Sequence, residues 1–114
     1  MAREIVMPTN KHTPSPWTAR EVRSPNVPGQ IAYAIDFNED QEQVVDWVYE
    51  KSDAHLIAAA PDLLADLREA ASTLRRYEAI HRSKGTDDSA EKAEVNAALA
   101  ARFEATIDKA GGAS

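Results

Sequence analysis

Residues 53–67 read DAHLIAAAPDLLADL, an apolar helical run with a proline, Pro61, in its middle. Inside a continuous helix, a proline removes one backbone donor and its ring clashes with the carbonyl four residues earlier, whereas at the first helical position it is harmless. We therefore expect either a kink or a helix break at Ala60, with Ser52 as the N-cap of the first segment. After Pro61, apolar residues recur at steps of four and three, which places them on one helix face. These residues are Leu63, Leu67, Ala70, Leu74, Tyr77 and His81.

A second helix is predicted from Asp88 to about Ala110. Asp88 followed by Glu91 has the spacing of a capping box, and Gly111 is expected to end the helix. Only a short polar turn around Gly85 separates the two long helices, so they should form an antiparallel hairpin.

In the N-terminal third of the sequence, the residue pattern predicts β-strands. Five of the six prolines lie within the first 28 residues, so residues 1–16 should form an extended, mobile arm. Alternation predicts strands over residues 17–22 and 31–37, joined by a turn. Residues 44–49, VVDWVY, favour a third strand by composition, although the preceding acids would also suit a helix start. The predicted fold class is α+β: a small antiparallel β-sheet of two or three strands, a Pro-kinked helix and a C-terminal antiparallel helical hairpin. One domain should span residues 17–110, with a flexible tail at 111–114.

Two motifs carry a family resemblance. His12 to Trp17 read HTPSPW, and DAHLIAAAPDLL follows about 35 residues later. The pair resembles small phage and prophage proteins with an HTPGPW-like start, a short β region and a [DN]A[HR]LIAAAP[DE]LL helix, over roughly residues 12–75. The resemblance favours a strand at 44–49 and implies a phage or prophage origin. It implies no activity, since most such proteins have no assigned function.

Composition restricts the function classes. The chain of 114 residues has no cysteine, which excludes disulfide frameworks and thiolate metal sites. No apolar run approaches the ~20 residues that cross a bilayer, and the N-terminus lacks a long apolar segment. We therefore expect no membrane association, and action in the cytoplasm of a bacterial host.

No combination of residues predicts catalysis. His12, His55 and His81 lack a second ligand at metal spacing, and the four glycines form no phosphate-binding loop. Ser52, Asp53 and His55 are the residue types of a nucleophilic catalytic site, but the start of a helix explains them more simply. We expect no enzyme, no metal site and no cofactor.

Charge is distributed unevenly in this acidic chain of net charge −6. Acids dominate residues 36–53, next to two aromatic residues, and this block is predicted to bind a basic surface of a partner. Its proposed contact residues are Asp36, Glu39, Asp40, Glu42, Asp46, Trp47, Tyr49 and Glu50. An alternative anion-binding stripe on the helix consists of Arg68, Arg75, Arg76 and Arg82.

The sequence thus predicts a non-enzymatic interaction protein. Its size, acidity and lack of catalytic residues are similar to those of anti-CRISPR inhibitors, which suggests a counter-defence protein that occludes a host protein or ribonucleoprotein complex. One alternative is an oligomeric sponge for a signalling nucleotide, held by the arginine stripe. Another is a regulatory or morphogenesis accessory protein of the phage. Because alanine-rich helices bury little area, a homodimer that buries the Leu/Ala stripe is also considered.

Overall fold

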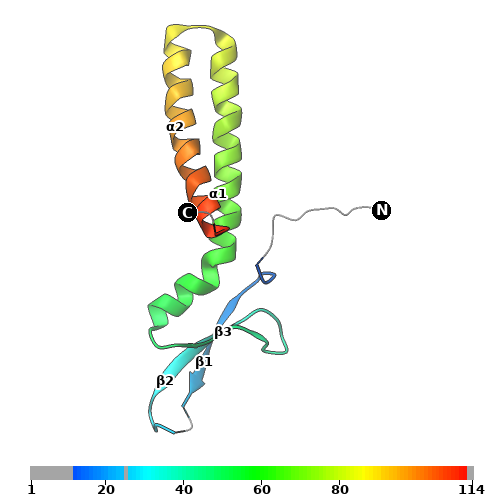
Figure 1. The fold of residues 1–114 in the computed structure, drawn as a ribbon, viewed down its shortest axis with the longest axis vertical. Helices are drawn as coiled ribbons and strands as arrows, with labels where there is room; N and C mark the ends of the chain where they lie inside the picture. The colour runs from blue at the N-terminus through cyan, green and yellow to red at the C-terminus, as the bar shows by residue number, and fades with distance from the viewer. Residues whose placement is uncertain (1–11, 25, 113–114) are drawn as a thin grey trace, which may run out of the picture. The chain divides into compact units, whose positions relative to one another are not determined.

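The computed structural model describes residues 12–24 and 26–112, and it shows a small antiparallel sheet followed by two helices (Figure 1). The strands are β1 (Thr18–Arg23), β2 (Ile31–Asp36) and β3 (Gln43–Val48), and the helices are α1 (Lys51–Lys84) and α2 (Asp87–Ala110). These elements confirm the predicted α+β class. They also confirm the third strand.

The chain divides into two compact units, and the boundary lies within α1, between Asp62 and Leu63. The first, which we call the sheet unit, contains the three strands and the start of α1. The second, the hairpin unit, contains the rest of α1 together with α2. Each unit is described separately below.

In the sheet unit, β2 is the central strand and pairs with both neighbours in antiparallel orientation. Ile35 lies opposite Ala19 of β1 and Val45 of β3, and its side chain is fully buried. Its strand neighbours Ala32 and Ala34 are fully buried too. A register shift between the Tyr33 and Ile35 pairs marks an irregularity in β3. The core of this unit therefore depends on one large aliphatic residue surrounded by small ones.

The HTPSPW motif forms a local cluster immediately before β1. The Trp17 Nε1–H donates to the Thr13 carbonyl at 3.1 Å, and the His12 ring lies edge-on to the Trp17 ring with centroids 5.9 Å apart. The strand predicted from Trp17 accordingly begins one residue later, at Thr18. The other residues of the predicted N-terminal arm, 1–11, lie outside the described residues.

Helix α1 continues through Pro61 as one helix, so the alternative of a helix break at Ala60 is wrong. A proline at this position costs one backbone hydrogen bond, because it cannot donate to the Ile57 carbonyl. The predicted N-cap is also wrong. The helix already begins at Lys51, and the Ala54 N–H donates to the Glu50 carbonyl at 3.0 Å, so Ser52 lies inside the first turn.

Thr86, and not the predicted Asp88, is the N-cap of α2. Its hydroxyl accepts a hydrogen bond from the Ser89 N–H at 3.1 Å, and its backbone is extended. The connection between the helices is therefore only Gly85 and Thr86, with Gly85 at φ +72°. A positive φ of this kind favours glycine and ends the preceding helix. At the other end, Gly111 terminates α2 as predicted, and its N–H donates to the Ile107 and Asp108 carbonyls.

The seam between the two helices of the hairpin unit contains small side chains. Ala71 of α1 and Ala93, Ala100 and Ser89 of α2 are buried. Small residues allow the helices to pack closely, but each buries little apolar area. The larger apolar side chains of both helices remain half-buried or exposed.

Candidate functional site

The sheet unit carries an acidic surface, which we define as Glu39, Asp40, Glu42, Asp46 and Glu50. All five side chains are exposed, and they follow one another along the β2–β3 connection, β3 and the residues before α1. No basic residue occurs between Arg23 and Lys51. Among the described residues, none of the five carboxylates forms an ion pair. Their negative charge is therefore exposed and is not neutralised by any residue that the structure describes.

The β2–β3 connection is held in a defined conformation by Asn38. Its side-chain oxygen accepts from the Glu42 N–H at 3.1 Å, and its amide nitrogen donates to the Glu42 carboxylate at 2.7 Å. The Phe37 N–H donates to the Glu42 carbonyl at 2.9 Å and closes the loop. Glu42 is thus partly engaged in building the turn, whereas Glu39 and Asp40 lie at its exposed tip.

Asp36 has a different environment from the other predicted contact residues. Its side chain is only 8% exposed, and Arg20 holds it through two hydrogen bonds, Nε to Oδ2 at 2.7 Å and Nη2 to Oδ1 at 3.3 Å. A buried carboxylate needs such a partner, because an unpaired charge in the interior is costly. Asp36 therefore supports the sheet and is not part of the exposed acidic surface. Sequence reasoning missed this pairing, which depends on the register between β1 and β2.

Two aromatic residues lie next to the acidic surface. The Trp47 and Tyr49 rings meet edge-to-face, with centroids 6.0 Å apart and an interplanar angle of 79°. Trp47 is half-buried, whereas Tyr49 is 63% exposed. This ring contact orients an exposed aromatic side chain, a type that often dominates the energetics of protein interfaces.

The alternative site, the arginine stripe, lies in the hairpin unit. The Arg75 guanidinium donates to both carboxylate oxygens of Glu104, at 3.0 and 2.6 Å, and to Glu78 at 2.9 Å. Arg82 donates to Glu78 at 2.9 Å and to Glu94 at 3.0 Å. The network has one more carboxylate than guanidinium group. A phosphate would have to displace these glutamates, so the anion-binding role of the stripe, including Arg68 and Arg76, stays a prediction.

These contacts shift the acidities of the network. Hydrogen bonds from Arg75 and Arg82 lower the pKa of Glu78 below its ordinary value of 4.5, and the hydrogen bond from Arg75 lowers the pKa of Glu104. The same hydrogen bonds raise the pKa values of both arginines. Glu78 and Glu104 therefore stay ionised at neutral pH, and their bonds to the arginines include the contact between Arg75 and Glu104 that links α1 to α2.

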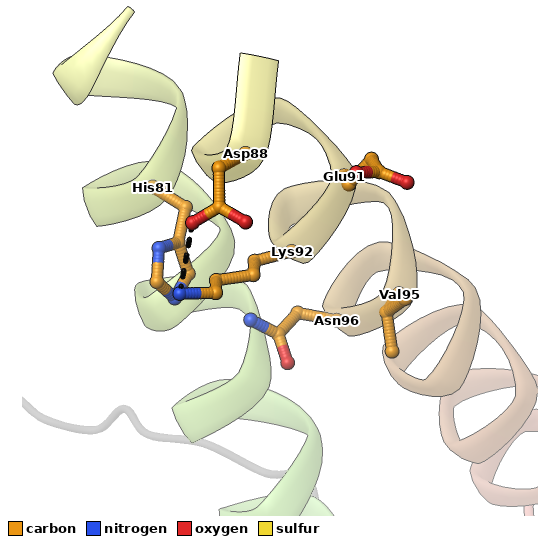
Figure 2. A pocket seen from close by; sticks show the side chains of 6 residues that line it. All are labelled: His81, Asp88, Glu91, Lys92, Val95 and Asn96. Carbon is orange, nitrogen blue, oxygen red and sulfur yellow. Dashed lines mark ion pairs between the residues drawn. The ribbon is translucent and has the colours of Figure 1, made fainter. Parts of the chain in front are cut away.

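A groove of about 410 Å³ lies near the α1–α2 connection, and Figure 2 shows its lining. His81 of α1 and Lys92 and Asn96 of α2 point into it (Figure 2). The Lys92 ammonium lies 3.1 Å from the Asp88 carboxylate, and His81 Nδ1 is buried without a hydrogen-bond partner among the described residues. No hydroxyl or thiol side chain lines the groove.

In the described ranges, 12–24 and 26–112, no three histidine or acidic side chains come together as a metal site would require. No helix in this part of the chain is both long enough and apolar enough to span a bilayer.

Comparison with known proteins identifies the family. The model of the family described as Salmonella phage P22 protein Y8K6 matches residues 2–114. The chain belongs to this family. Membership confirms that this is a phage-type protein, as the two sequence motifs predicted, while the family's description states no activity. No curated protein and no solved structure matches the chain.

Proposed function

We propose that this phage-family protein is a non-enzymatic interaction protein that acts in the host cytoplasm. Its acidic surface and Tyr49 would bind a basic, nucleic-acid-binding surface of a host protein or ribonucleoprotein complex and block it, as counter-defence inhibitors of the anti-CRISPR type do. The observation that carries this proposal is the run of exposed carboxylates along residues 39–50, which have no ion-pair partner within the described part of the chain, together with the exposed ring of Tyr49.

The contrast between the two units supports this assignment. In the hairpin unit, Glu78, Glu94 and Glu104 are paired with arginines, and Asp88 is paired with Lys92. Its exposed acids without an ion pair among the described residues, such as Glu69, Glu91 and Asp108, each have a basic neighbour in the sequence. In the sheet unit, by contrast, the acids of the acidic surface have no basic partner among the described residues. A surface of one sign attracts a partner of opposite sign and raises the rate of association.

The aromatic pair of Trp47 and Tyr49 supplies an apolar contribution to affinity that charged residues alone do not. Exposed charges contribute mainly to the association rate and are screened by salt, whereas buried aromatic anchors dominate affinity. Tyr49 is placed to provide such an anchor, since Trp47 holds its ring on one side and most of its surface is exposed.

The test is affinity capture from a nuclease-treated host lysate, with three forms of the tagged protein. A charge variant carries Glu39→Gln, Asp40→Asn and Asp46→Asn, which leaves the bonded Glu42 and Asp36 intact. A matched control removes three exposed acids of the hairpin unit through Glu69→Gln, Glu91→Gln and Asp108→Asn, and has the same net charge as the charge variant.

The proposal predicts a nucleic-acid-binding host protein captured by wild type and control but lost from the charge variant. Capture that the charge variant retains, or that both variants lose equally, would contradict a role for the acidic surface. Equal loss would mean that net charge alone matters.

A further inference from the structure

The two sides of the hairpin unit differ in chemistry. One side carries the ion-pair network in which Arg75 bonds Glu104 and Arg82 bonds Glu94 across the helices. Leu74 directly precedes Arg75, and Phe103 directly precedes Glu104. One step along a helix turns about 100°. Because the two helices are antiparallel, this rotation places Leu74 and Phe103 on the same side of the hairpin, opposite the ion-pair network.

That opposite side is apolar, and we call it the apolar face. Helical spacing places on it the predicted stripe of α1 and the matching stripe of α2. Its members are Leu63, Leu67, Leu74 and Tyr77 of α1 with Val95, Leu99 and Phe103 of α2. Leu63 and Tyr77 are 53% and 49% exposed, and Val95 is 68% exposed. The groove of Figure 2, lined by His81, Val95 and Asn96, lies at the end of this face near the α1–α2 connection (Figure 2).

The hairpin unit does not bury this face by itself. Two helices share one seam, and here that seam is filled by Ala71, Ala93 and Ala100. The leucines and Phe103 flank the seam and are only half-buried or exposed. A four-helix arrangement buries such side chains in a common core.

The charges beside the apolar face are arranged for an antiparallel second copy. Asp66 lies near one end of the face and Lys84 near the other, and neither has an ion-pair partner among the described residues, whereas Lys92 is paired with Asp88. In a two-fold dimer with the hairpins head to tail, Asp66 of each copy approaches Lys84 of its partner. In a parallel pair the like charges would meet.

We propose that two copies of this chain pack their apolar faces together, head to tail, as an antiparallel four-helix bundle. A two-fold interface requires a self-complementary surface, and the apolar face with opposite charges at its ends is one. The face extends over about 33 Å, at 1.5 Å per residue for the 22 residues from Leu63 to Lys84. With two helices about 10 Å wide, it presents on the order of 600 Å², close to the ~800 Å² per partner of a standard interface.

Molar mass in solution tests the interface, by light scattering and sedimentation over a concentration series. The wild type should have twice the mass of the 12.5 kDa chain. Tyr77→Glu should weaken dimerisation at least ~100-fold, because each dimer would bury the new charge twice.

The matched control is Ala79→Glu. Ala79 is exposed, and its spacing of four residues from Arg75 and three from Arg82 places it on the side of the ion-pair network, so this variant should remain a dimer. A wild type that is monomeric at every concentration, or an Ala79→Glu variant that dissociates as readily as Tyr77→Glu, would overturn the proposal.

The orientation is tested by cross-linking, which does not depend on destabilising variants. The chain has no cysteine, so introduced thiols are unique. A mixture of Asp66→Cys and Lys84→Cys proteins should give a cross-linked heterodimer with a short bifunctional maleimide. Neither variant should cross-link with itself. Efficient self-cross-linking of Asp66→Cys, or no cross-link in the mixture, would contradict the head-to-tail arrangement.

Discussion

At the scale of single residues, the fold depends on very few large buried side chains. Ile35 on the central strand is the one large side chain that is fully buried among the described residues, and alanines occupy most other buried positions. A protein with so small a core has little stability to lose, since net stabilities are only about 5–15 kcal/mol. Its larger residues lie near the surface, where they are available for contacts with partners.

Ile35→Ala should therefore lower the free energy of unfolding by about 3 kcal/mol, because it removes buried methyl groups and leaves a cavity. Val27→Ala is the control, since Val27 is half exposed in the β1–β2 connection and should cost well under about 1 kcal/mol. Urea denaturation monitored by tryptophan fluorescence measures both. Equal effects for the two variants would show that the sheet core is not where the structure places it.

The sequence predicted the acidic block but not the different roles of its members. Charge counting treats Asp36 and Asp40 alike, whereas pairing with Arg20 removes Asp36 from the surface. That pairing depends on which residues of β1 and β2 lie opposite each other, and one-dimensional patterns do not specify the register. The two hydrogen bonds between Asn38 and Glu42 were missed as well, although an asparagine at the start of a polar turn is a recognised signal.

At the scale of elements, most of the secondary structure was predictable from periodicity. Alternation found the strands, steps of three and four found the helices, and glycine marked the helix ends. The errors fell at helix starts, where several residues can act as caps. Asp88 has the better capping-box spacing. However, α1 ends directly before Gly85, whose φ is positive, and Thr86 after this glycine caps α2. Of the two alternatives predicted at Pro61, a kink or a helix break, the break is wrong, because α1 continues through this residue.

The capping roles can be separated by mutation. Thr86→Ala should destabilise the hairpin unit by about 1 kcal/mol, because the Ser89 N–H loses its acceptor. Asp88→Ala should cost only a few tenths of a kcal/mol, since its exposed pair with Lys92 contributes little. Thermal unfolding followed by circular dichroism at 222 nm provides the comparison. A larger loss for Asp88→Ala would restore the cap predicted from sequence.

The ion-pair network predicts how the hairpin unit responds to acid. The pKa values of Glu78 and Glu104 are lower in the folded state than the ordinary value of 4.5, so the folded state binds protons less readily than the unfolded state. Their contribution to stability is complete above about pH 5 and is lost as the pH falls through their lowered values.

Thermal unfolding from pH 7 to pH 3 tests this response. The melting temperature should fall below about pH 4.5, and Glu104→Gln should show a smaller fall because one of the shifted groups is gone. The exposed Glu91→Gln is the control and should follow the wild type. A Glu104→Gln profile identical in shape to that of the wild type would show that the cross-helix pair does not stabilise the fold.

At the scale of the whole molecule, the protein presents two surfaces on two units. The acidic surface of the sheet unit is proposed to bind a partner, and the apolar face of the hairpin unit is proposed to bind a second copy. The sequence predicted that neither surface contains a catalytic arrangement, and family membership establishes the phage character without an activity. The identity of a partner could not be predicted, because residues on one chain specify only the complementary charge and shape.

The measurement that tests the central claim most directly is displacement of nucleic acid from the captured host partner. A labelled oligonucleotide bound to that partner is titrated with wild-type protein, the Glu39/Asp40/Asp46 charge variant and Tyr49→Ala, and fluorescence anisotropy is recorded at two salt concentrations. The wild type should release the oligonucleotide, less effectively at high salt. The charge variant and Tyr49→Ala should each be at least ~30-fold weaker, which corresponds to about 2 kcal/mol at a hot spot. Binding of wild type without release of the oligonucleotide, or equal potency of all three proteins, would contradict the claim that the acidic surface occupies a nucleic-acid site.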